Sequence, residues 1–120
     1  MSKRKNAHGS GSYAGPGGNL GYMESPKEAV LRELREECGD SLLVSDPELL
    51  SVVHWEEYAP VHYIGIGFVA EYQSGEPRLG EPEKFEAWGW YELADLPEPL
   101  FGVMQAYITA YKTGVSYIET

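Results

Sequence analysis

The spacing of apolar residues along the chain predicts two helices and three longer strands. Residues 26–38 and 101–113 carry apolar side chains at helical spacing. Residues 49–58, 61–72 and 87–93 are rich in valine, isoleucine and aromatic residues, which favour strands. Helices and strands along one short chain predict the α/β class.

The first two strands are expected to pair antiparallel, because only Ala59-Pro60 separates them. In the second strand Gly65 and Gly67 share one face, so another element or a ligand can approach that face closely. The segments rich in glycine, proline and charge are expected to be loops or connections; they are residues 1–12, 41–47, 73–84 and 95–99. Tyr13-Ala14 is expected to be the tail of a strand that enters a glycine-rich turn.

The first helix carries its own start and stop signals. Ser25 suits the N-cap, Pro26 the first helical position, and Glu28 the third position of a capping box. Gly39 is well placed to end the helix.

Three carboxylates gather on one face of this helix. At about 100° per residue, Glu33, Glu36 and Glu37 fall beside the apolar arc of the helix. Like charges three and four residues apart repel each other modestly, so this face can simply be solvated. Alternatively, the carboxylate oxygens can hold Mg²⁺ or Mn²⁺, whose charge would remove the repulsion.

Charge and composition narrow the partners. The chain has 120 residues and a formal net charge of −10, which disfavours a nucleic acid polymer or an acidic membrane as a partner. A phosphorylated small molecule remains possible if a divalent cation bridges it to the acidic helix. Cys38, the only cysteine, lies on the apolar arc and is expected to pack in the core. With no apolar run as long as a membrane span, a cytoplasmic location is expected.

The spacing of glycine and charged residues adds a family resemblance. Gly18, Glu24 and the run Arg32-Glu33-Leu34-Arg35-Glu36-Glu37-Cys38-Gly39 follow the pattern G-x5-E-x7-R-E-U-x-E-E-x-G-U, except that Asp40 stands at the last aliphatic position. This stretch resembles the Nudix box of the Nudix hydrolase superfamily. Residues 81–101 more loosely resemble MutT-type members that hydrolyse nucleoside triphosphates. The resemblance implies one Nudix-like domain over residues 1–120, an α/β/α sandwich around a mixed sheet.

It also implies roles for the acidic helix. Glu33, Glu36 and Glu37 match the metal carboxylates of the family, with Mg²⁺ or Mn²⁺ as the ion, and Glu33 is a candidate general base. Gly17 matches a position whose backbone carbonyl often completes the metal shell. Arg32 and Glu24 match a pair that braces the turn against the helix; the alternative is an ordinary surface ion pair.

Further candidates lie outside the motif. A later acid often joins the metal site or serves as base, and Glu83 and Glu86 are the candidates, with a solvated loop as the alternative. The walls of a slot for the nucleotide base, or else core aromatics, are Tyr22, His62, Tyr63, Trp88 and Trp90.

Several features depart from the family pattern. Family members usually begin with two further strands, so the expected fold is N-terminally shortened. A homodimer that supplies the missing surface, a fragment and a natural truncation are the three explanations, and the homodimer is preferred. Gly15 replaces a bulky residue, Gly21 a glutamate and Met23 a glycine. Met23 can change the turn, because a residue with a Cβ does not freely take a positive φ.

These features leave three functions to compare. The first is Mg²⁺-dependent hydrolysis of a (d)NTP to a nucleoside monophosphate and pyrophosphate, in cleaning the nucleotide pool or in pyrimidine nucleotide turnover. The second is cleavage of ADP-ribose or a nucleotide sugar. The third, from a different class, is a nucleotide-binding module with weak or lost turnover.

Overall fold

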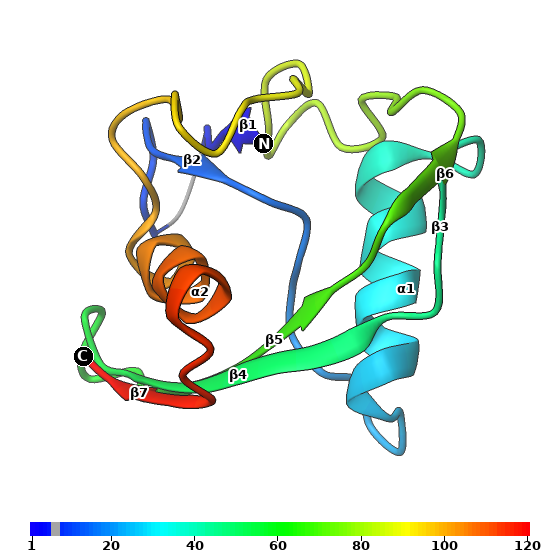
Figure 1. Cartoon of the computed structure of the whole chain (residues 1–120). Coiled ribbons are helices and arrows are strands. Elements are labelled where there is room, and N and C mark those ends of the chain that lie inside the picture. Colours follow the sequence, from blue (N-terminus) through cyan, green and yellow to red (C-terminus); the bar gives the residue numbers. More distant parts are fainter. Residues whose placement is uncertain (6–7) are drawn as a thin grey trace.

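In the described part of the chain, a mixed three-stranded sheet lies beside two helices. The structure is a computed structural model that describes residues 1–5 and 8–120. The central strand β4 (Glu48–Trp55) pairs antiparallel with β5 (Tyr63–Val69) and parallel with β7 (Tyr117–Glu119). Figure 1 shows helix α2 lying over the β7 end of this sheet and helix α1 standing near the other end. The predicted antiparallel pair is confirmed, whereas β7 was not predicted.

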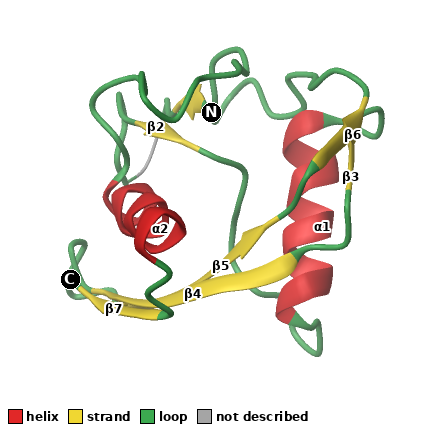
Figure 2. Cartoon of the chain, in the orientation of Figure 1, coloured by secondary structure: helices red, strands yellow, loops and turns green. Residues whose placement is uncertain are grey.

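Two short strand pairs complete the architecture, as Figure 2 shows by colour. One joins β1 (Ser2–Lys3) to β2 (Tyr13–Ala14), and the other joins β3 (Leu43–Val44) to β6 (Tyr72–Ser74). The prediction that residues 1–12 form only a loop is therefore wrong at β1. The reason is long-range pairing, since Lys3 and Met1 also accept backbone hydrogen bonds from Glu86 and Gly89, at 3.0 and 2.9 Å.

The strand predicted at residues 87–93 does not form. This segment runs beside the first residues of the chain, but its partner β1 is only two residues long, so no continuous ladder develops. Its aromatic residues serve side-chain contacts instead, such as the 4.9 Å approach of the Trp88 and Phe85 rings. Aromatic richness here reflects packing of a loop.

Helix α2 (Gly102–Thr113) covers the hydrophobic core, and its predicted bounds are confirmed to within one residue. Phe101, Val103 and Ala106 pack with Val53 of β4 and with Ala14 of β2. The expected close approach over the strand glycines is also seen. A Cβ added to Gly67 would lie 2.6 Å from the ring of Tyr107, so the helix sits where only a glycine leaves room.

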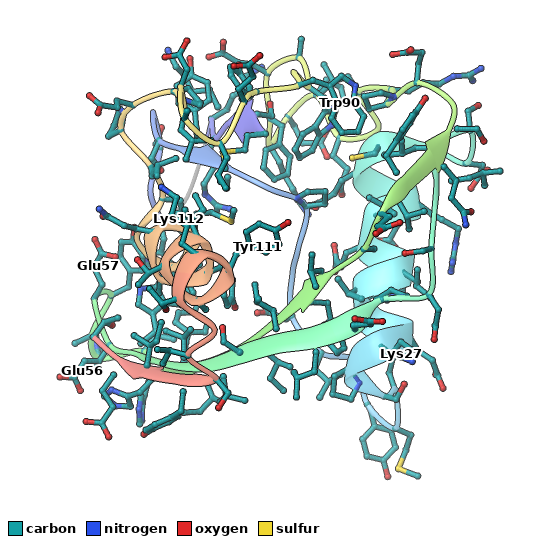
Figure 3. All side chains as sticks on the ribbon, viewed as in Figure 1. Lys27, Glu56, Glu57, Trp90, Tyr111 and Lys112 are labelled. Atoms are coloured by element: carbon teal, nitrogen blue, oxygen red, sulfur yellow. The ribbon has the colours of Figure 1, made fainter. Side chains whose placement is uncertain are left out.

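Helix α1 (Pro26–Cys38) forms as predicted, with both caps in place. The Ser25 hydroxyl accepts a hydrogen bond from the Glu28 N–H at 3.1 Å. Gly39 ends the helix with φ 83° and donates its N–H to the Arg35 carbonyl at 2.9 Å. Lys27, in the first turn, pairs with Asp46 at 3.2 Å (Figure 3). In the described part of the chain, neither helix has the length and apolar character needed to cross a membrane.

Candidate active site

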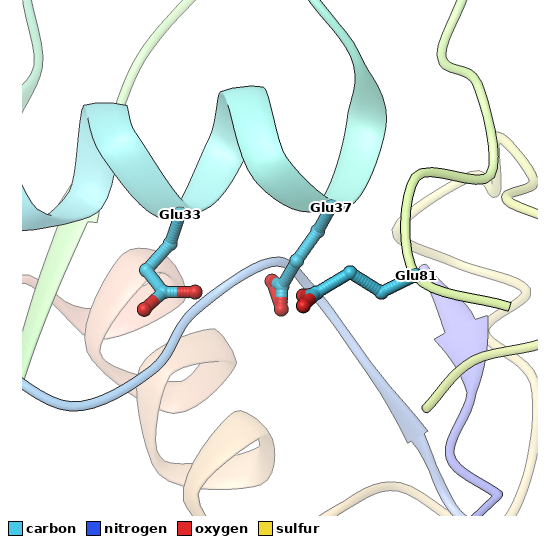
Figure 4. Close-up of side chains that lie close together, drawn as sticks. All are labelled: Glu33, Glu37 and Glu81. Carbon is cyan, nitrogen blue, oxygen red and sulfur yellow. The ribbon is translucent and has the colours of Figure 1, made fainter. Parts of the chain in front are cut away.

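Three carboxylates meet at the C-terminal half of α1. Glu33 and Glu37 are four residues apart, so both side chains leave the helix on the same side. Glu81 approaches them from a loop (Figure 4). Oxygen atoms of these three side chains all lie within 4.8 Å of one another. We call these three residues the carboxylate cluster.

The end of α1 holds the loop that carries Glu81. The last carbonyls of a helix lack partners within the helix, and this loop provides them. Arg78 donates its N–H to the Cys38 carbonyl at 2.7 Å, and Gly80 donates to the Glu37 carbonyl at 3.0 Å. The Trp88 indole N–H donates to the same Glu37 carbonyl at 2.8 Å. The backbone of the loop is thereby held one residue before Glu81.

The glycine-rich turn, which precedes α1 in the sequence, also contacts the carboxylate cluster. The Gly17 N–H donates to Oε1 of Glu37 at 2.8 Å. A Cβ at Gly18 would collide with the carboxylate of Glu33, so a larger residue there would displace that carboxylate. The sequence predicted a metal contact through the Gly17 carbonyl; the bond seen in the structure uses its N–H.

Burial and crowding disfavour the ionised form of the buried carboxyl in the cluster. Glu37 is only 2% exposed, and burial raises its pKa to about 8, opposed by the Gly17 N–H and supported by the charges of Glu33 and Glu81. Oε1 of Glu81 is buried and has no hydrogen-bond partner among the described residues. The other oxygen of Glu81 lies 3.2 Å from the Lys84 ammonium. A buried acceptor without a donor, among crowded carboxylates, is the setting that a divalent cation satisfies.

Arg32 ties the glycine-rich turn to the helix. Its guanidinium contacts both oxygens of Glu24, at 2.7 and 3.1 Å, and donates to the Asn19 carbonyl at 3.1 Å. It also donates to Glu33 at 2.8 Å. Hydrogen bonds from Arg32 lower the pKa of the Glu24 carboxyl. Arg32 and Glu24 therefore connect the glycine-rich turn to Glu33 of the carboxylate cluster. An isolated surface ion pair would not make these additional contacts.

The structure separates the other predicted acids from the cluster. Glu36 is exposed and its carboxylate lies 3.2 Å from Arg32. Glu83 and Glu86 are also exposed, and neither belongs to the group that meets at α1. Sequence reasoning missed Glu81, although it stands two residues before Glu83 in the same loop. The run Gly80-Glu81-Pro82-Glu83 holds two acids in one loop, and the sequence pattern does not distinguish which of the two approaches the helix.

The aromatic residues predicted to form a slot for the nucleotide base differ in exposure and in the residues that they contact. Tyr22 is 96% exposed. His62 is exposed and lies 4.9 Å from the ring of His54, whereas Tyr63 is half-buried against Trp55. Only Trp88 among the four substrate-binding candidates bonds directly to a residue of the carboxylate cluster, among the contacts of the described residues. Trp90, the fifth aromatic, is exposed beside Tyr72.

A cavity of about 540 Å³ opens elsewhere, between α2 and β7. Trp55, Ala106 and Ile118 are among its lining residues, and no member of the carboxylate cluster is. Its place in the fold gives it no part in the chemistry of the acids.

Comparison with known proteins agrees with the motif and the fold. A family model of the NUDIX domain matches residues 1–111. The chain belongs to the NUDIX domain family. The MutT NUDIX hydrolase from Burkholderia pseudomallei superposes with a TM-score of 0.83 and 36% identity, covering 91% of this chain and 84% of that one. The predicted family, the α/β class and the mixed sheet are therefore confirmed.

Two curated relatives show which NUDIX proteins the chain is similar to. It is 37% identical over 100 residues to the ADP-ribose pyrophosphatase of Methanocaldococcus jannaschii, which covers 82% of this chain and 57% of the relative. It is 33% identical over 108 residues to the RNA pyrophosphohydrolase of Gluconacetobacter diazotrophicus, covering 73% of this chain and 61% of the relative. The chain thus spans less than two thirds of the length of these relatives.

Proposed function

We propose that this chain hydrolyses a phosphoanhydride bond in a nucleoside diphosphate-linked compound, with a divalent cation held by the carboxylate cluster. The observation that carries the proposal is the meeting of Glu33 and Glu37 of the motif helix with Glu81 of a loop, with one buried oxygen of Glu81 unpartnered among the described residues. NUDIX membership supports the reaction class, because the proteins similar to this chain are named as pyrophosphatases and hydrolases of this family.

The chain's own residues would share the work as follows. Mg²⁺ or Mn²⁺ would neutralise the phosphate charge and activate water. Glu33, Glu37 and Glu81 would supply its carboxylate ligands, and Glu36 and the Gly17 carbonyl remain predicted ligands from the motif. Glu33 is the candidate base, and the Arg32 hydrogen bond at 2.8 Å fixes the direction of its carboxylate. Arg32 and Glu24 would keep the turn in register with the helix.

We propose a (d)NTP as the first substrate to test. Its hydrolysis would release a nucleoside monophosphate and pyrophosphate. ADP-ribose or a nucleotide sugar is the second candidate, favoured by the 37% identity to an ADP-ribose pyrophosphatase. RNA 5′ ends are a third possibility suggested by the RNA pyrophosphohydrolases. The net charge of −10 opposes long-range attraction of an RNA polymer, so we rank this substrate last.

A substrate panel tests the reaction. With Mg²⁺ present, phosphate and pyrophosphate release would be measured for the canonical (d)NTPs and a 5′-triphosphorylated RNA. For ADP-ribose and a nucleotide sugar, which yield a nucleoside monophosphate and a sugar phosphate, the nucleoside monophosphate would be measured by chromatography. Glu33→Gln should lose turnover. Glu83→Gln should keep it, since Glu83 is exposed, lies in the loop that carries Glu81 and stands outside the carboxylate cluster. Equal turnover by the wild type and Glu33→Gln would refute the site.

The same panel separates an enzyme from a binding module. A module would release no product from any compound, yet nucleotides would still raise its melting temperature. The close packing of three acids, with one buried oxygen unpartnered among the described residues, supports the enzyme, because it offers the oxygen ligands that a divalent cation requires.

We further infer that residues 1–120 act as one domain, as a cytoplasmic homodimer that takes small nucleotides. The parallel pairing of β7 with β4 supports the single domain, because it joins the C-terminal residues to the central sheet. Exposed Ile64 and Ile66 on β5 support a second copy. Light scattering on the purified chain would test the dimer, and a monomer at micromolar concentration would refute it. Microscopy of a tagged chain would test the location.

A further inference from the structure

A lysine shares the loop that delivers Glu81 to the carboxylate cluster. The Lys84 ammonium lies 3.2 Å from Oε2 of Glu81. The hydrogen bond to Glu81, with smaller contributions from the charges of Glu33 and Glu37, raises the pKa of Lys84. Lys84 thus holds, with its side chain about half exposed, the oxygen of Glu81 that faces away from the buried one.

The backbone fixes where this lysine starts. The Lys84 and Phe85 N–H groups both donate to the Glu81 carbonyl, at 3.0 and 3.1 Å, which closes a tight turn. Phe85 is buried and forms a bridge with Arg4. Lys84 therefore cannot drift from Glu81 by loop motion alone; only its flexible, largely solvated side chain can move.

We propose that Lys84 is the internal counter-cation of the carboxylate cluster: it occupies Glu81 in the metal-free protein, competes with the divalent cation, and contacts a substrate phosphate once that cation takes Glu81. The proposal rests on the proposed function, since it assumes that the cluster holds a cation. The ammonium on Oε2 and a divalent cation on the free Oε1 would repel each other across one carboxylate, so the ammonium is released as the cation binds. An ammonium on a flexible stem then suits a phosphate oxygen.

The proposal predicts opposite effects on two ligands. In Lys84→Gln, Mn²⁺ should bind about two- to fivefold more tightly, the range expected for a charge pair whose ammonium is half exposed. A nucleoside triphosphate carrying a methylene group in place of the α,β-bridging oxygen, with excess Mg²⁺, should bind about fivefold more weakly for the same reason. Lys84→Arg should restore both affinities to within about twofold of the wild type.

Calorimetry on the full chain measures both affinities without turnover. The matched control is Lys27→Gln, which removes an equal charge from an exposed pair of the same 3.2 Å length at the other end of α1 (Figure 3). It should leave both affinities unchanged. A loop that is merely loosened by substitution would weaken both ligands, and that result would overturn the proposal, as would unchanged affinities for both.

The failure of this proposal can be told apart from failure of the proposed function. If the wild type binds Mn²⁺, Glu37→Gln does not, and Lys84→Gln matches the wild type, then the counter-cation role is wrong and the metal site stands. If the wild type binds no Mn²⁺ at millimolar concentration, both proposals are overturned.

Discussion

The two helices differ in what they bury. The buried residues of α2 are all apolar: Val103, Ala106 and Ala110. Those of α1 are Ala29, Cys38 and one carboxylate, Glu37. Helix α2 therefore gains its stability from the core, while α1 buries an ionisable group where an apolar side chain would cost less.

The two helices also differ in how they are held. Helix α2 has no side-chain cap at its N-terminus and depends on packing against β4. Helix α1 has a capped start, a glycine end and the Arg32 network, and its apolar Leu31 and Leu34 are only half-buried. Local polar contacts can fix α1 without covering its acidic face. Helix α2 therefore contributes to the hydrophobic core, and α1 carries two of the three acids of the carboxylate cluster.

The largest expected effect is on α1. Glu37→Gln should reduce turnover of the best panel substrate about a thousandfold, because a metal ion contributes several kcal/mol of charge stabilisation. At pH 7 the metal-free protein should unfold at about the same denaturant concentration, since burial raises the pKa of Glu37 to about 8 and the amide replaces a carboxyl that is largely protonated there. Steady-state kinetics and urea unfolding measure the two quantities. Lost stability with retained turnover would reverse the roles assigned to the helices.

The next effect is on the α2 side. Phe101→Ala should lower the free energy of unfolding by about 3 to 4 kcal/mol, because a buried aromatic ring leaves a cavity in the core. Urea unfolding followed by tryptophan fluorescence measures the change. Tyr111→Ala on the exposed side of α2 is the control and should change stability by less than about 0.5 kcal/mol. Equal losses would mean that α2 is not packed as described.

Local signals predicted the helices and the main hairpin well. For α1, the cap at Ser25, the proline and the terminal glycine all lie within the segment itself, so no distant contact had to be known. For β4 and β5, composition and a short connection sufficed. The predictions for β1 and for residues 87–93 were wrong for one shared reason. Backbone hydrogen bonds join the first residues of the chain to residues 86–89, which lie far away in the sequence.

The site was half predictable for the same reason. Helical periodicity places Glu33 and Glu37 together from sequence alone. Glu81 reaches them only because Gly80 and Arg78 bond to the last carbonyls of α1, a contact that no periodicity encodes. Glu36 faces solvent because the loop covers one side of the acidic face and not the other.

The pH dependence of stability provides a third test of the difference between the two helices. Burial raises the pKa of Glu37 to about 8, above its usual value of 4.5, so the folded metal-free protein holds a proton that the unfolded chain releases. Stability should therefore be greatest near pH 5 and fall by several degrees in melting temperature as the pH rises to about 8. A metal displaces that proton, so stabilisation by Mg²⁺ should grow over the same interval.

Calorimetric melting with chelator or with Mg²⁺, at pH 5, 6.5 and 8, measures both trends. Glu37→Gln should flatten the dependence in each condition. A wild-type stability that rises between pH 5 and pH 8 in the presence of chelator would show that Glu37 is already ionised in the metal-free fold.

The smallest expected effect concerns the turn that leads into α1. Met23 takes φ 62° although it has a Cβ, and its side chain is 85% exposed. Because the left-handed region costs a residue with a Cβ about 1 kcal/mol or more, Met23→Gly should raise the free energy of unfolding by about 0.5 to 1 kcal/mol, after the flexibility that glycine adds to the unfolded chain. Met23→Ala keeps the Cβ and should give no such gain in urea unfolding. If alanine stabilised the protein as much as glycine, the benefit would come from losing an exposed apolar side chain, and the turn before α1 would carry no backbone strain.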